Sequence, residues 1–175
     1  MKKFLALLLA VGMVLSMTAC AAKEEEVEKT PLTKDLAAIM DDIYAQHPVE
    51  LSLANMTVDI NDTEWALKSY TGLSSNENVK EAVASEAMIG SIPYSLVLVR
   101  LDEGADAKAV AEEMKAGIDT RKWICVEADD LLVSGYCDVI MLVMVGSEYA
   151  ESGITAQAMT DAFAAVCGGT LDFTI

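Results

Sequence analysis

Two uninterrupted apolar runs, Leu96–Val99 and Val139–Val145, constrain the fold more than any other feature of the chain. Strands of this composition are typically buried on both faces of a sheet, so both faces need a cover. Each run lies in the second predicted strand of a unit in which two strands precede a helix. The first unit has strands 79–87 and 92–101 and helix 106–117, and the second has strands 123–127 and 131–145 and helix 155–167.

The predicted fold class is therefore α+β, an antiparallel sheet built from two consecutive β-β-α units and preceded by an N-terminal helix. That first helix is predicted over residues 34–46, with Thr33 as its N-cap. A short strand is expected within residues 50–60. A brief helix is expected to follow it and to stop near Gly72.

The repeated pattern suggests a pseudo-symmetric sheet, although the β-β-α unit is common enough for the repetition to be a coincidence. We expect the two repeat helices to cover one face of the sheet. The N-terminal helix or a partner subunit is then expected to cover the other face. The long strand 131–145 is expected to bend or bulge at Gly135.

Residues 1–20 have the organisation of a bacterial export signal. Two lysines give a positive start, the run Phe4–Met17 is apolar, and small residues precede Cys20. A membrane-spanning helix needs about 20 apolar residues, so the shorter run favours a cleaved signal peptide. A lipobox of this kind predicts fatty acyl chains such as palmitate on Cys20, and two chains are enough for stable anchoring. An ordinary secreted protein with a chance cysteine is the alternative.

Three regions follow from this interpretation. Residues 1–19 are the lipoprotein signal peptide, and residues 20–31 are the lipidated cysteine and an acidic, disordered tether. Residues 32–175 form a single domain, which is long enough to bury a core. The expected location is the extracytoplasmic face of the cell membrane.

The mature chain is strongly acidic. The full chain has 12 basic and 28 acidic residues, and removal of Lys2 and Lys3 with the signal leaves a formal charge of −18. Arg121-Lys122 is the one adjacent basic pair that remains, so the sequence predicts no nucleic-acid partner. The same charge repels an anionic lipid surface, so the lipid must provide the membrane attachment. The acidic surface serves solubility or attracts a basic partner.

Three cysteines remain after Cys20: Cys125, Cys137 and Cys167. An odd number, with a single histidine and no C-x-x-C motif, does not support a disulfide scaffold, a zinc site or a thioredoxin-like site. Cys125 and Cys137 could form a disulfide if their strands pair in the right register. Otherwise the thiols are expected to be buried. The sequence predicts no metal site and no cofactor.

The polar residues form no catalytic constellation. His47 ends the first predicted helix, without a nucleophile motif elsewhere in the chain, so it is predicted to be a helix-end or surface residue. The acidic pairs Asp41-Asp42 and Asp129-Asp130 are predicted to be solvated. The segment Asp59–Glu64 lacks the Gly and Glu positions of an EF-hand loop, so Asp62 is predicted to be a helix cap.

Three aromatic residues are candidates for a ligand groove: Trp65, Tyr70 and Tyr94. Each is predicted near a loop or a strand end, where aromatic side chains often line binding grooves. The alternative is that they anchor the core.

Several stretches resemble a family of small lipoproteins of Gram-positive bacteria that carry a domain of unknown function. The stretches are Val79–Met88 with Tyr94–Arg100, and Lys122–Val126 with Asp138–Met144. The resemblance covers most of residues 51–163 and supplies no catalytic or binding residues. Because genes of this family can lie near envelope polysaccharide acyl-transfer systems, it implies an accessory role in the envelope.

The function predicted from the sequence is a lipid-anchored, extracytoplasmic, non-catalytic binding or accessory module, with an envelope protein or polysaccharide as its partner. One alternative is an envelope hydrolase or transferase that uses Ser91, Ser95 or Cys125 as a nucleophile. Another alternative is a structural homodimer.

Overall fold

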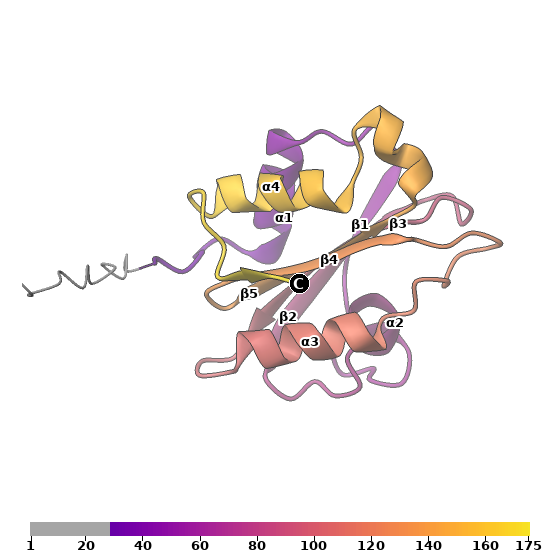
Figure 1. Ribbon diagram of the computed structural model, residues 1–175. Coiled ribbons are helices and arrows are strands. Elements are labelled where there is room, and N and C mark those ends of the chain that lie inside the picture. Colours follow the sequence, from indigo (N-terminus) through magenta and orange to yellow (C-terminus); the bar gives the residue numbers. More distant parts are fainter. Residues whose placement is uncertain (1–28) are drawn as a thin grey trace, which may run out of the picture.

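The computed structural model describes residues 29–175 and shows an antiparallel sheet with helices on both faces (Figure 1). The strand order is β1-β2-β3-β5-β4-β6. The strands are β1 (Leu53–Thr57), β2 (Val79–Ala87), β3 (Tyr94–Leu101), β4 (Asp130–Tyr136), β5 (Val139–Val145) and β6 (Phe173–Thr174). The helices are α1 (Leu36–Gln46), α2 (Ala66–Thr71), α3 (Ala107–Gly117), the 3₁₀ helix η1 (Ser147–Ser152) and α4 (Ala156–Val166). The predicted α+β class and N-terminal helix are confirmed.

Strands β3 and β5 form the centre of the sheet, with Val97 directly opposite Leu142. Every residue of both strands is buried, as their apolar composition predicts. Side chains alternate between the faces, so Leu96 packs into the core under α1 and α4 and Val97 packs into the core over α2 and α3. The sheet therefore separates two cores.

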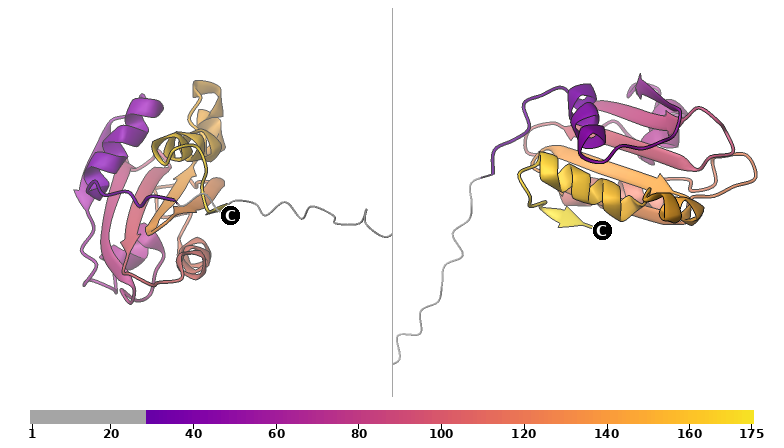
Figure 2. Two further views of the ribbon diagram at one scale, coloured as in Figure 1. Left: turned by 90° about the vertical axis from the view of Figure 1, so that its left-hand side faces the viewer. Right: turned by 90° about the horizontal axis from the view of Figure 1, so that it is seen from above.

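The two repeat helices lie on opposite faces of the sheet, and the prediction that they share a face is wrong. Helices α1 and α4 lie side by side on one face, and α3 lies with α2 on the other (Figures 1 and 2). A two-fold axis normal to the sheet between β3 and β5 would place α3 and α4 on the same face. The repeat is therefore a local sequence pattern and not a symmetric duplication of the fold.

The predicted long strand 131–145 is two strands that are joined by a tight turn. The turn contains Cys137, whose φ of 51° lies in the left-handed region that glycine and asparagine usually occupy. The left-handed residue of the turn is a cysteine, so the hairpin was missed although the turn residue Asp138 follows it. The predicted strand 123–127 is a loop. Gly135 makes no bulge and pairs with Ile140 in regular register. Its missing side chain leaves room for the ring of Phe173 in β6.

Three helices begin at side chains that accept a hydrogen bond from the first turn: Asp35 for α1, Asp106 for α3 and Thr155 for α4. The N-cap of α1 is thus Asp35 and not the predicted Thr33, because the Asp35 carboxylate lies 2.7 Å from the amide nitrogen of Ala38. Helix α2 ends at Gly72, as predicted.

The chain enters the fold through residues 29–34, which we call the strap. Arg100 of β3 binds the strap, and its side chain is only 9% exposed. The guanidinium donates hydrogen bonds to the carbonyl oxygens of Leu32 (2.7 Å) and Lys34 (2.6 Å) and pairs with two carboxylates. The strap is therefore fixed at the end of the sheet where β3 ends.

Candidate functional site

A largely buried lysine fixes the loop between α3 and β4 (residues 118–129) onto the other end of the sheet. The side chain of Lys122 is 15% exposed, and its Nζ atom contacts the Glu86 carboxylate. The same nitrogen lies 3.1 Å from the carbonyl oxygen of Ser69 and 3.5 Å from the hydroxyl oxygen of Ser95. We call these four residues the Lys122 cluster. It joins the loop to α2, β2 and β3.

Burial lowers the pKa of Lys122, and the contact with Glu86 acts in the opposite direction. The neighbouring Arg121 side chain is 78% exposed. Its Nε atom lies 3.3 Å from the Oε2 atom of Glu127, and this ion pair faces solvent. Two adjacent cations thus have different environments. The buried one needs its partners, because removal of one member of a buried pair leaves an uncompensated charge.

Aromatic rings surround the Lys122 ammonium. The ring centroids of Tyr70 and Trp123 lie 5.2 and 5.3 Å from its Nζ atom, which is cation–π distance. Trp65 packs edge-to-face on Tyr70, with 6.1 Å between the centroids, and remains 63% exposed. The structure therefore brings together two of the predicted groove residues, Trp65 and Tyr70, and the cation beside them is the chain's own.

Tyr94 does not join this group, because it points to the opposite face of the sheet and is fully buried. Its hydroxyl oxygen lies 3.1 Å from that of Tyr44, which donates a hydrogen bond to Ser85. Burial holds the pKa of Tyr94 well above its usual value. Tyr94 is thus a core anchor, which was the alternative interpretation of this residue.

Of the three candidate nucleophiles, Ser95 is the one placed beside a carboxylate. Its hydroxyl donates a hydrogen bond of 2.9 Å to Glu86, but the residue is fully buried. A shallow hollow of about 450 Å³ opens nearby in the loop; its lining comprises Arg121, Trp123, Cys125, Val126 and Glu127, without Ser95. Ser91 and Cys125 are exposed on loops.

The remaining polar candidates have structural roles. His47 caps the end of α1, and its Nε2 atom lies 2.9 Å from the carbonyl oxygen of Gly153, as expected for a helix-end residue. Asp129 accepts hydrogen bonds from the amide and hydroxyl of Ser147, and these bonds lower its pKa. Asp130 accepts a hydrogen bond from the first amide of α4. The two carboxylates therefore act separately, since Asp129 binds Ser147 and Asp130 binds the start of α4.

Asp62 accepts a hydrogen bond from the amide of Trp65 in the turn before α2. The N-cap of α2 is Trp65, so the prediction that Asp62 caps this helix is wrong. Within residues 29–175 no group of three or more His, Cys, Asp or Glu side chains is placed to hold a metal ion. Over the same residues, no helix is long and apolar enough to cross a membrane.

The three described cysteines are free, and Cys20 lies outside the described residues. Cys125 precedes β4 and Cys137 follows it. A strand of 7 residues spans about 23 Å, whereas a disulfide needs Cα atoms within about 7 Å, so these two thiols cannot pair.

Because of Cys167, the free energy of unfolding should depend on pH in the alkaline range. Burial raises its pKa to about 12, with smaller effects from Cys137 and Asp172. The folded chain then keeps a proton that the unfolded chain loses above about pH 9, so this contribution to stability falls as the pH rises towards 12. Urea unfolding across this range should show a shallower decline for Cys167→Ala. The exposed Cys125→Ala control should keep the full decline, and equal slopes in the two variants would contradict the assignment.

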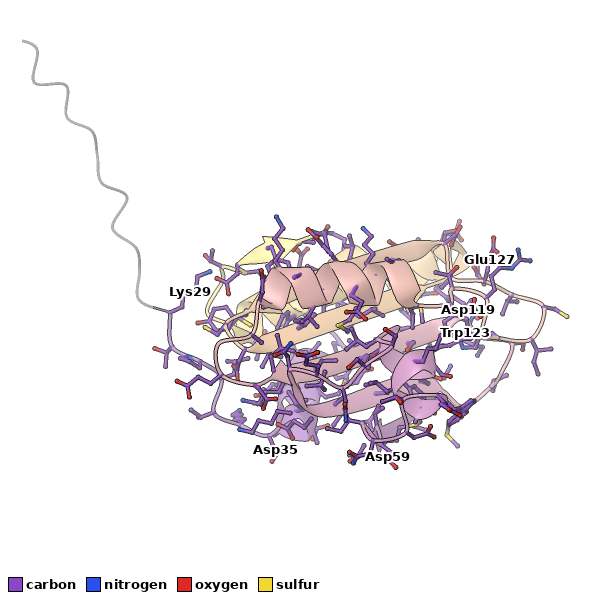
Figure 3. The ribbon with its side chains drawn as sticks, turned by 90° about the horizontal axis from the view of Figure 1, so that it is seen from below. Lys29, Asp35, Asp59, Asp119, Trp123 and Glu127 are labelled. Carbon is purple, nitrogen blue, oxygen red and sulfur yellow. The ribbon has the colours of Figure 1, made fainter. Side chains whose placement is uncertain are left out.

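Large apolar side chains are exposed at the same end as the 118–129 loop. Met88 and Ile89, in the β2–β3 turn, are 69% and 54% exposed, and Ile124 is 70% exposed. We call these three residues the loop-end patch. Lys29, at the start of the strap, lies at the far end of the molecule from Trp123 and Glu127 of the loop (Figure 3).

Sequence reasoning missed the Lys122–Glu86 pair and the Arg100 contact with the strap. Arg100 had one available signal, since it is a charged residue at the end of an apolar strand. Lys122 had no such signal, because its burial depends on a pairing across 36 residues.

No protein-family model matches this chain, and no curated protein or solved structure matches it either. The resemblance to Gram-positive lipoproteins therefore stays an expectation, and the function must be argued from the chain itself.

Proposed function

We propose that the protein is a lipid-anchored, extracytoplasmic module that binds or assists a partner in the cell envelope, without catalysis of its own. The observation that carries the proposal is the placement of the two ends of the domain. The strap, which leads back to Cys20, is fixed at one end of the sheet. The 118–129 loop lies at the other end, where Trp123 and Glu127 are far from Lys29 (Figures 1 and 3).

The strap has contacts that would hold this orientation. Besides the Arg100 bonds, Lys29 pairs with Asp172 at 2.5 Å, and the Tyr136 hydroxyl donates a hydrogen bond to the carbonyl oxygen of Thr30. A chain attached to the membrane through Cys20 would then present the loop end away from the bilayer. The acidic surface would keep the domain clear of anionic lipid.

The polar groups best suited to catalysis are used elsewhere, which also supports a binding role. Ser95 is fully buried within the Lys122 cluster, and His47 is hydrogen-bonded to Gly153 at the end of η1. General-base catalysis needs a base within reach of an accessible nucleophile.

Cys20→Ala should abolish membrane attachment. Without the thiol there is no acylation, so the protein should accumulate as an uncleaved precursor or be released into the medium. Membrane fractionation, detergent partitioning and mass spectrometry of the N-terminus measure this. Cys125→Ala, which removes a thiol outside the lipobox, should remain fully membrane-bound. Unchanged membrane retention of Cys20→Ala would refute the anchor.

A serine hydrolase or transferase is the second candidate, and the Ser95–Glu86 hydrogen bond favours it. A fluorophosphonate probe of the intact protein tests it, with Ser95→Ala and Ser91→Ala as variants. Because Ser95 is buried, we expect no labelling that depends on it. Labelling that disappears only in Ser95→Ala would replace the binding role with catalysis.

A further inference from the structure

We propose that the loop-end patch is a docking surface for a protein partner that presents an apolar pocket within a positively charged surround. The inference rests on the proposed function, because it assumes a domain held at the cell surface with its loop end free. It adds the location of the contact and the chemistry of the partner.

The segment that carries Ile124 packs on the β2–β3 turn, which carries Met88 and Ile89. The amide of Ile124 donates a 2.9 Å hydrogen bond to the carbonyl oxygen of Gly90, next to Ile89. A methyl group placed on Gly90 would lie 3.5 Å from the Cδ1 atom of Ile124, so that side chain packs over the β2–β3 turn. Contiguous exposed apolar surface of this kind marks interaction sites.

The patch is held in place before any partner arrives. The amide of Met88 donates a hydrogen bond to the carbonyl oxygen of Ser52, and that of Ile92 donates one to Ile89. Lys122, two residues before Ile124, is fixed by its buried cluster. A preorganised surface loses little conformational freedom on binding, which favours specific association.

Charge around the patch selects the partner. Exposed carboxylates of Glu127, Asp129 and Glu148 lie on the segments that adjoin this end, and the exposed cation Arg121 is already paired with Glu127. A second copy of this chain would bring the same negative charge, and an anionic bilayer would also be repelled. Apolar anchors within an acidic surround are complementary to an apolar pocket within a basic one.

The test places a photo-crosslinking amino acid at Ser91, an exposed residue in the turn of the patch, in the full-length chain expressed in its own bacterium. We expect one protein adduct whose crosslinked peptide, mapped by mass spectrometry, lies on a basic surface with apolar residues. Ile124→Asp should reduce the adduct at least tenfold, which is the effect of losing an interface anchor. The matched control Thr170→Asp adds the same charge on an exposed loop elsewhere and should leave the adduct unchanged.

Four results would overturn the docking surface: no adduct, an adduct with a second copy or with lipid, a partner surface that is acidic, or an adduct that Ile124→Asp leaves intact. Acylation of Cys20 is measured in the same cells, so the two proposals fail separately. An anchored protein without the adduct overturns the patch alone. If the protein carries no lipid but still forms an adduct that Ile124→Asp reduces, the lipid anchor is overturned and the docking surface is retained.

Discussion

Gly72→Ala is expected to destabilise the protein by about 4 kcal/mol, a large fraction of the stability of an ordinary domain. Gly72 has a φ of 80°, which costs a residue with a side chain about 1–3 kcal/mol. A Cβ atom there would also lie 2.5 Å from the Ile118 nitrogen and 2.5 Å from the Met114 oxygen. Both are backbone atoms of the α3 end, which cannot rotate away, so overpacking adds about 1–3 kcal/mol.

Gly104→Ala is the matched control for this change. Its φ of 85° is similar, but nothing lies within 4 Å of the Cβ position. It should therefore show the conformational cost alone, and urea unfolding at an unchanged m value measures the difference. If both variants lose the same stability, the ends of α2 and α3 do not approach as closely as the structure shows.

Lys122→Met is expected to cost about 3 kcal/mol, because the Glu86 carboxylate would remain largely buried without its cation. Methionine keeps most of the side-chain volume, so the loss reports the missing charge and its bonds to Ser69 and Ser95. Amide hydrogen exchange in residues 118–129 should also become faster, since this side chain fixes the loop to the sheet.

The adjacent Arg121→Met is the control for position and charge. Arg121 is exposed and its pair with Glu127 faces solvent, so its loss should change stability by no more than about 0.5 kcal/mol. The double variant Lys122→Met/Glu86→Leu should recover most of the stability, because it leaves no unpaired charge. A double variant as unstable as Lys122→Met would show that packing, and not the ion pair, holds the loop.

Much of the fold could be predicted because its signals are local. The stripe of apolar residues in α1, the Thr155 cap of α4 and the glycine at the end of α2 are each encoded within a few residues. The β4–β5 hairpin was missed for the same reason, since Cys137 adopts a turn conformation that its residue type does not signal. Local patterns predict elements only where the residue type and the conformation agree.

The candidate sites were predictable only in part. Trp65 and Tyr70 are five residues apart and pack on each other, and their role in a ligand groove stays a prediction. Tyr94 was grouped with them wrongly, because the face to which a strand residue points depends on the register with β2 and β5. The exposed patch of Met88, Ile89 and Ile124 combines two segments that are distant in sequence. It could not be predicted, because a hydrophobic residue in a sequence is expected to lie in the core.

The sequence alone determined the helices α1, α3 and α4 and the apolar strands β3 and β5 at the centre of the sheet. It also determined that the chain is acidic and that its first 20 residues predict export and lipidation. Those properties depend on composition and on spacing along one stretch of chain. The tertiary structure decided that α3 and α4 cover opposite faces, that Arg100 fixes the strap, and that Lys122 is buried while Arg121 is exposed. These outcomes depend on contacts between residues far apart in the chain, which form only when the sheet brings them together.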